Sequence, residues 1–189
     1  YEDWGNQGQR GKPPEIKDFI RESELIKQNA LKLYEKVMTE HPTYERNDEV
    51  LFYLGYNEYE AGNKNKAVTH YWTLIKQFPQ SKLVPDAYLQ LGEHFFSDNN
   101  VAKARKAYER ALATDVGRVY NYALYKLAWC DYNAGDYEEG LKKFHAVVDY
   151  ADKEGRALSD LKSEALRDVV LTYVQLNRAE MHVKRQRYE

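Results

Sequence analysis

Histidine, cysteine and carboxylate side chains most often perform catalysis or bind metal ions, and in this sequence they are scattered. No two histidines are three or four residues apart; the five are His41, His70, His94, His145 and His182. Acidic pairs such as Glu138 and Glu139 are typical of solvated helix faces. The single cysteine, Cys130, excludes an internal disulfide and a cysteine-rich zinc site. No glycine-rich phosphate loop or nucleophile motif occurs either. The sequence therefore predicts no enzyme, no catalytic residues, no metal site and no cofactor.

The overall composition excludes several other classes of protein. The chain carries 28 basic and 30 acidic residues, a net charge of −2, and so lacks the positive field that attracts nucleic acid or anionic membranes. No apolar run approaches the roughly 18–20 residues of a membrane span. A length of 189 residues with 43% apolar residues supports one domain or one repeat array. The 17 tyrosines are an unusual excess and direct attention to where they lie.

Apolar residues recurring at steps of three and four predict helices along most of the chain. A long helix is predicted from Glu15 to His41, because the residue before Pro42 avoids helical backbone angles. Helix pairs are then predicted near residues 48–77, 84–114 and 120–150, with a further helix near 158–176. No segment alternates with the period of a strand, so no sheet is predicted. Residues 1–14, rich in Gly, Gln and Pro, are predicted to be a flexible leader.

The helical segments repeat one pattern of small and large residues. The segment at residues 54–59 recurs at 91–96 and 127–132, and its small residue advances by 37 and then 36 positions. Each copy continues with a second small residue and then a large aromatic residue: Ala67 and Tyr71, Ala104 and Tyr108, Gly140 and Phe144. The small residues allow two helices to approach closely, and the aromatic ring fills the space between successive hairpins. Each helix pair needs a neighbour to bury its apolar face, which explains the tandem arrangement.

This pattern resembles the tetratricopeptide repeat, a tandem unit of about 34 residues that forms an antiparallel helix pair. The resemblance covers residues 48–152 as three repeats, with partial repeats on either side, in an array at residues 15–189. It implies an all-α fold, a right-handed superhelix of antiparallel helix pairs. The wider spacing predicts longer connections between repeats. One of these, residues 78–81 followed by Asp86 and Ala87, resembles a bacterial cell-envelope branch that includes the Tol–Pal coordinator and an outer-membrane assembly lipoprotein.

In the tetratricopeptide repeat family, the first helix of each pair lines the concave groove of the superhelix. The resemblance therefore assigns twelve positions of this chain to a groove, and eight of them are aromatic. They are Glu49, Phe52, Tyr56 and Tyr59; Asp86, Leu89, Glu93 and Phe96; and Tyr122, Tyr125, Trp129 and Tyr132. Spacings of three and four place each set on one helix face. All except Glu49 and Asp86 are predicted to bind a partner. The Lys and Asn residues of the chaperone-type carboxylate clamp are absent here.

The aromatic positions support three interpretations. The first is a groove for an extended or helical segment of a partner protein, because Tyr and Trp combine a large rigid contact area with one polar group. The second is a tightly curled array that turns these rings against its own neighbours. The third is a carbohydrate-binding groove. The favoured function is a scaffold in a bacterial envelope complex for outer-membrane assembly, division or surface motility, in the periplasm or at the outer membrane. A cytosolic peptide-binding co-chaperone or adaptor is the alternative.

Three further features bear on partners. A basic cluster is either a solvated helix face or a site for an acidic partner; its members are Lys103, Arg105, Lys106, Arg110 and Arg118. The last predicted helix has few polar residues around Val169 and Val170, and repeat arrays normally end in a polar cap. We therefore expect this helix to continue into further repeats or to mediate self-association. The chain begins with Tyr1 rather than Met, so we expect it to be a processed or excised piece.

Overall fold

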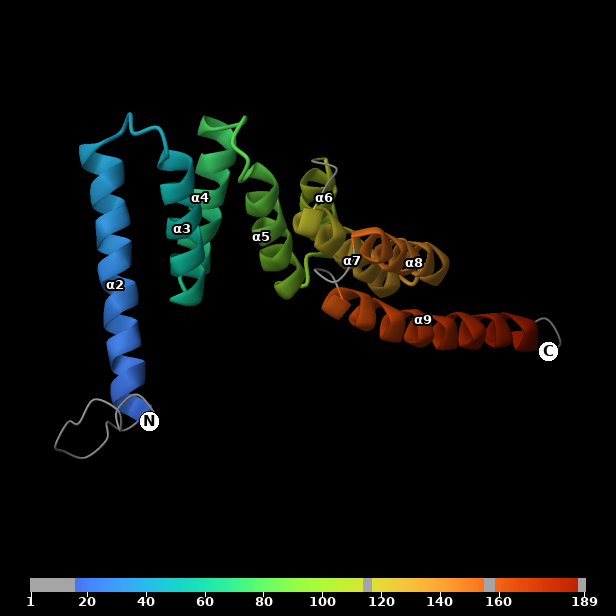
Figure 1. Ribbon diagram of the computed structural model, residues 1–189. Helices are drawn as coiled ribbons and strands as arrows, with labels where there is room; N and C mark the ends of the chain where they lie inside the picture. Colours follow the sequence, from blue (N-terminus) through green and yellow to red (C-terminus); the bar gives the residue numbers. More distant parts are fainter. Residues whose placement is uncertain (1–15, 114–116, 155–158, 187–189) are drawn as a thin grey trace. The chain divides into compact units, whose positions relative to one another are not determined.

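The computed structural model describes residues 16–113, 117–154 and 159–186, and that part of the chain forms eight helices and no strand (Figure 1). The helices are α2 (Ile16–Glu40), α3 (Asn47–Glu60), α4 (Lys64–Gln77), α5 (Val84–Ser97), α6 (Val101–Leu112), α7 (Gly117–Ala134), α8 (Tyr137–Glu154) and α9 (Ser159–Gln186). The predicted all-α fold and its helix pairs are confirmed. The last helix runs on to Gln186 instead of ending near Leu176, since no Gly or Pro follows to end it. The predicted leader, residues 1–14, lies outside the described residues.

The chain forms two compact units, residues 1–70 and 71–189. The first contains α2, α3 and the N-terminal half of α4, and α2 packs against α3. The rings of Tyr34 and Tyr53 stack there with their centroids 6.2 Å apart. The second unit contains the rest of α4 and helices α5 to α9. The predicted division into a leader and one array stays a prediction.

Turns with left-handed backbone angles separate the two helices of each pair. Gly62, Asn99 and Gly135 have φ angles of 83°, 57° and 81°. Glycine adopts this region without a steric penalty, and asparagine tolerates it better than most residues. The predicted breaks around residues 61–63, 97–100 and 134–136 are therefore confirmed. Between repeats, the longer connection predicted at Pro79 is also present, since α4 ends at Gln77 and α5 begins at Val84.

Small residues allow the helices of the second unit to approach closely, as predicted. A Cβ atom added to Gly92 would lie only 2.3 Å from Cε1 of Tyr108, so no larger residue fits between α5 and α6. A Cβ atom on Gly140 would lie 3.1 Å from the carbonyl oxygen of Ala128, where α8 meets α7. The buried core on both sides of Tyr108 consists of Ala104, Ala111, Ala123, Leu127 and Cys130. The aromatic residue thus fills the seam within its own repeat and the seam with the next.

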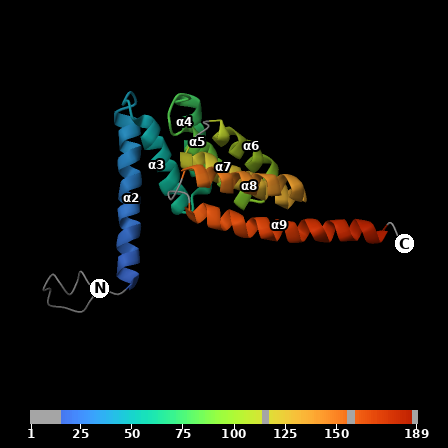
Figure 2. The same cartoon turned by 45° about the vertical axis from the view of Figure 1, so that its right-hand side comes forward.

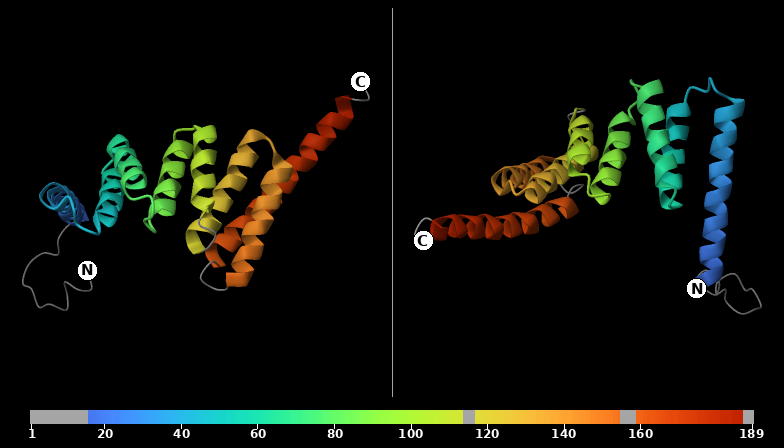
Figure 3. Two further views of the ribbon diagram at one scale, coloured as in Figure 1. Left: turned by 90° about the horizontal axis from the view of Figure 1, so that it is seen from above. Right: turned by 180° about the vertical axis from the view of Figure 1, so that it is seen from behind.

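Helices α5 to α8 lie side by side in chain order, and α9 packs along α8 and α7 (Figure 3, left). The core between the last three helices contains Ala128, Phe144, Val147, Ala165 and Val169. The C-terminal half of α9 extends away from α7 and α8 (Figure 2). Exposed apolar side chains occur in both halves of α9, among them Val170 before the midpoint and Tyr173 and Val174 just after it.

Candidate partner-binding surface

Three of the predicted groove residues lie on α3, in the first unit. Tyr56 is 47% exposed, whereas Phe52 and Tyr59 are half-buried. The Phe52 ring meets the edge of the neighbouring Tyr53 ring, with centroids 5.8 Å apart. The ammonium of Lys64 lies 5.8 Å from the centroid of the Tyr59 ring. Tyr56 therefore has the most accessible ring of the three.

In the second unit, predicted groove residues from α5 and α7 surround Lys126, which the sequence analysis did not select. Lys126 Nζ lies 3.0 Å from Glu93 Oε2 and 4.8 Å from the centroid of the Phe96 ring. It also lies 5.6 Å from the centroid of the Tyr122 ring. One carboxylate and two aromatic faces thus hold the ammonium. Its position one helical turn after Tyr122, on the predicted face, was the signal that could have identified it.

Both carboxylate oxygens of Glu93 interact with side chains of its own chain. The Tyr108 hydroxyl donates to Glu93 Oε1 at 2.6 Å, while Oε2 pairs with Lys126. Burial raises the pKa of Tyr108, and the hydrogen bond to Glu93 adds to the shift, so the phenol remains protonated and continues to donate. Leu89 on the same helix is half-buried and packs against the core around Tyr108. These contacts join α5, α6 and α7 at the predicted surface.

The aromatic residues of α7 are fixed by contacts with α8 and α9. The Tyr125 hydroxyl donates to Asp168 Oδ2 at 2.7 Å, and burial raises the pKa of this phenol. The rings of Tyr125 and Trp129 contact Phe144 with centroid distances of 5.7 and 5.8 Å. The Trp129 ring also meets the Tyr132 ring at 5.1 Å. All of the aromatic residues of α7 remain partly exposed. Their role in binding stays a prediction.

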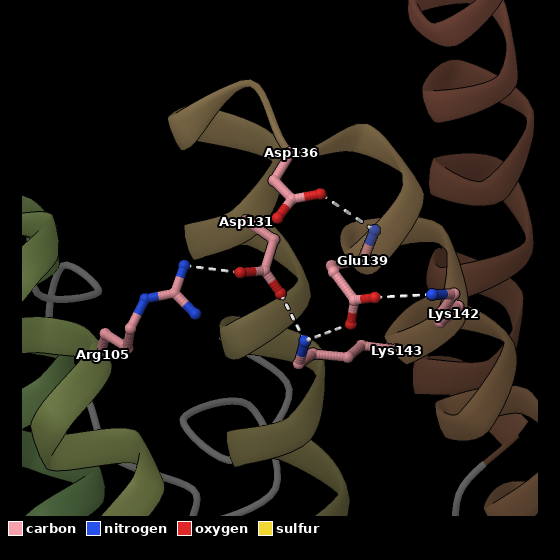
Figure 4. Close-up of polar contacts among 6 residues, drawn as sticks. All are labelled: Arg105, Asp131, Asp136, Glu139, Lys142 and Lys143. Carbon is pink, nitrogen blue, oxygen red and sulfur yellow. Dashed lines mark hydrogen bonds and ion pairs between the residues drawn. The ribbon is translucent and has the colours of Figure 1, made fainter.

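A buried carboxylate on α7, also absent from the predicted set, joins three helices (Figure 4). The Asp131 side chain is 5% exposed, and Arg105 Nη2 of α6 donates to its Oδ1 at 2.5 Å. Lys143 Nζ of α8 forms an ion pair with its Oδ2 at 2.6 Å. Burial lowers the pKa of Arg105, but the hydrogen bond to Asp131 and the attraction of nearby negative charges, that of Asp131 above all, together outweigh burial, and the net shift is upward. Three of the predicted basic cluster, Lys103, Lys106 and Arg110, remain exposed on α6.

The cysteine and two of the histidines lie in different environments. Cys130 is buried in the core, and burial raises the pKa of its thiol to about 11. His145 is exposed and His70 is half-buried, and burial lowers the pKa of His70. Across residues 16–113, 117–154 and 159–186, no three His, Cys, Asp or Glu side chains are close enough to hold a metal ion. None of the helices described has the length and apolarity of a membrane span.

Antiparallel helix pairs that pack through small residues define a helical repeat protein. The sequence model of the tetratricopeptide repeat matches residues 52–117 and 89–154, which together are more than half of the chain. The chain therefore belongs to the tetratricopeptide repeat family. No curated protein sequence matches it.

Solved structures share this fold at low sequence identity. The MamA protein is 22% identical with a TM-score of 0.64, over 87% of this chain and 81% of MamA. PcrH from Pseudomonas aeruginosa is 21% identical with a TM-score of 0.59, over 69% of this chain and 94% of PcrH. SycD, the type III secretion translocator chaperone of Yersinia enterocolitica, is 14% identical with a TM-score of 0.62, over 71% of this chain and 88% of SycD.

Proposed function

We propose that this chain is a non-catalytic scaffold for protein–protein interaction, and that the first helices of its repeats bind a partner protein. The observation that carries the proposal is the group of half-exposed rings on α5 and α7: Phe96, Tyr122, Tyr125, Trp129 and Tyr132. Contacts with Lys126, Phe144 and Asp168 hold several of these rings in place. Rings that are already ordered lose little entropy on binding, and aromatic residues contribute strongly to interfaces.

Family membership and one structural relative support a protein partner. Tetratricopeptide repeats commonly serve as interaction surfaces, and SycD is described as a translocator chaperone. The half-exposed rings are also compatible with a carbohydrate, and a cytosolic co-chaperone or adaptor is the alternative cellular role.

We place the scaffold in a bacterial envelope complex for outer-membrane assembly, division or surface motility, in the periplasm or at the outer membrane. The support is the resemblance of the connection at residues 78–81 to the envelope branch. Fractionation of cells that produce the full-length protein tests this location. Recovery in the cytoplasmic fraction would favour the co-chaperone or adaptor.

Single aromatic substitutions test the binding surface. Tyr56→Ala and Trp129→Ala are each expected to weaken binding to a partner recovered by pull-down by roughly thirtyfold, since truncating a central interface aromatic costs about 2 kcal/mol or more. The dissociation constant is measured by calorimetry and the melting temperature by circular dichroism. Tyr56→Ala should melt as the parent does, because its ring is exposed. Trp129→Ala should melt at a lower temperature, because it loses the contact with Phe144.

Tyr53→Ala is the matched control for this experiment. Tyr53 lies on the same helix as Tyr56 and is 46% exposed, but it is outside the predicted surface. Its substitution should leave the affinity within about twofold of the parent, well below a hot-spot effect. Equal losses for Tyr53→Ala and Tyr56→Ala would contradict the proposed surface, as would normal binding by both Tyr56→Ala and Trp129→Ala.

We also propose that α9 continues into further repeats or mediates self-association. Val170 is 64% exposed, and Tyr173 and Val174 next to it are exposed as well. Sedimentation velocity should show a concentration-dependent dimer, and Val170→Asp should dissociate it by placing a charge in an apolar contact. A chain that stays monomeric at every concentration would exclude self-association. A longer version of the protein would then show whether further repeats cover this face.

A further inference from the structure

A groove of about 1010 Å³ lies on α4, α5 and α6 of the second unit, and none of the residues that line it belongs to the predicted groove set. Aromatic side chains form its apolar part: Trp72, Tyr88 and Phe95. The Trp72 and Tyr88 rings meet edge to face with centroids 6.0 Å apart. Lys103, Lys106 and Arg110 of α6 form the other wall, together with the single acidic residue Glu109. The groove thus combines an aromatic wall with a net positive one.

The three basic residues of this wall lie on one face of α6. Their spacings of three and four residues place them in a row, and all three are exposed. Within the described residues, none of them forms an ion pair with a carboxylate of the chain. Arg105, on another face of the same helix, is bound to Asp131. The row is therefore available to an external anion.

Comparison of the repeats explains why Lys103 has no carboxylate partner. Three residues after the small residue, the first repeat carries the buried Glu58 and the third carries the buried Asp131. Lys66 of α4 pairs with Glu58 at 3.3 Å. The middle repeat has Phe95 at the same position, and Lys103, equivalent to Lys66, lies 5.5 Å from the Phe95 ring centroid. The change from carboxylate to phenyl removes the internal anion and adds an aromatic surface beside the cation.

We infer that this groove binds an acidic segment of a partner polypeptide, with an aromatic or large aliphatic side chain of that segment against Trp72 and Tyr88. Carboxylates of the segment pair with Lys103, Lys106 and Arg110. The corresponding hollow of the next repeat is smaller, about 250 Å³, and has Leu124 and Ala146 where this groove has Tyr88 and Arg110. The third repeat therefore does not reproduce this combination of Tyr88 and Arg110. It does not depend on the proposed function of the α5 and α7 rings.

A peptide suits this groove better than a nucleic acid. The chain as a whole carries a net charge of −2, and the basic row is one helix face with Glu109 beside it. A nucleic acid needs a broader positive surface that follows its backbone. A short acidic peptide needs only a few cations and one apolar anchor, and this groove supplies both.

The test uses a fluorescein-labelled synthetic peptide of twelve residues, made of glutamate and aspartate with two phenylalanines. Fluorescence polarisation at low and at physiological salt should show saturable binding that weakens as salt rises. Lys106→Glu combined with Arg110→Glu should weaken binding at least tenfold, because attraction becomes repulsion. Trp72→Ala should weaken binding about tenfold at both salt concentrations, because it removes apolar contact without changing charge. Circular dichroism checks that each variant remains helical.

Matched controls separate this site from general charge effects. Lys32→Glu combined with Lys153→Glu changes the net charge equally on α2 and α8, and it should leave the affinity within about twofold. A peptide with serine in place of phenylalanine, and a thymidine oligonucleotide of twelve residues, should both bind at least tenfold more weakly. No saturable binding, equal losses in the two double variants, or equal affinity for either control ligand would overturn the inference. Tyr56→Ala and Trp129→Ala should bind the acidic peptide as the parent does. The peptide experiment can therefore fail without contradicting the proposed function of the α5 and α7 rings, and the reverse also holds.

Discussion

Replacing Tyr108 with alanine is expected to lower the free energy of unfolding by about 3–5 kcal/mol, as large aromatic truncations in cores do. Tyr108 has no exposed surface. Its ring occupies the space that the absent side chain of Gly92 leaves, and it reaches the core residues of α7. The substitution also removes the hydrogen bond to Glu93. Urea titration followed by circular dichroism measures the loss.

Tyr108→Phe separates the ring from its hydroxyl. The phenyl ring preserves the packing against Gly92, and Glu93 keeps its pairing with Lys126. This variant should therefore lose only about 1.5–3 kcal/mol, the typical value of one hydrogen bond to a charged group. An alanine variant as stable as the parent would show that the seam does not depend on this ring. A phenylalanine variant as unstable as the alanine variant would assign the effect to the hydroxyl instead.

The role of Tyr108 illustrates why the fold could be predicted from the sequence. Its position relative to Ala104 and Gly92 recurs in the other repeats, as at Phe144 and Gly140. Helix pairs are local in the chain, so their packing rules leave a periodic pattern that a single sequence displays. The turns at Gly62 and Gly135 were also predictable, because they need backbone angles that glycine adopts freely.

The side-chain contacts of the candidate surface could be predicted less completely than the fold. Helical spacing correctly grouped Tyr122, Tyr125 and Trp129 on one helix, but it could not show how far each ring turns toward a neighbour. Tyr125 reaches Asp168, which lies on α9 and 43 residues later in the chain. Such a contact depends on how successive repeats pack, and no local pattern reports it. Lys126 was not predicted for a different reason: the predicted pattern consisted mainly of aromatic residues, whereas Lys126 is a basic residue whose ammonium lies beside two of those rings.

Replacing Asp131 is expected to have the second large effect on stability. Asp131→Ala should lower the free energy of unfolding by about 2–4 kcal/mol, because Arg105 and Lys143 would face one another without their shared carboxylate. The lower end of this range applies if water solvates the two cations in the variant, because both are partly exposed. Urea titration of this variant, beside Asp136→Ala as a control, measures the effect. The Asp136 side chain accepts a hydrogen bond from the Glu139 backbone at the start of α8, so its loss should cost about 1 kcal/mol.

A triple variant tests whether this ion cluster stabilises the fold or instead determines how α6, α7 and α8 align. Replacing a buried ion cluster with apolar residues of similar volume is often neutral or stabilising, whereas removing one member is costly. Arg105→Met, Asp131→Leu and Lys143→Met together should therefore restore most of the stability that Asp131→Ala loses. If the triple variant is as unstable as Asp131→Ala, the ion pairs themselves stabilise the seam. If it is stable, the cluster instead sets how α6, α7 and α8 align, because one carboxylate can bind both cations in only one register (Figure 4).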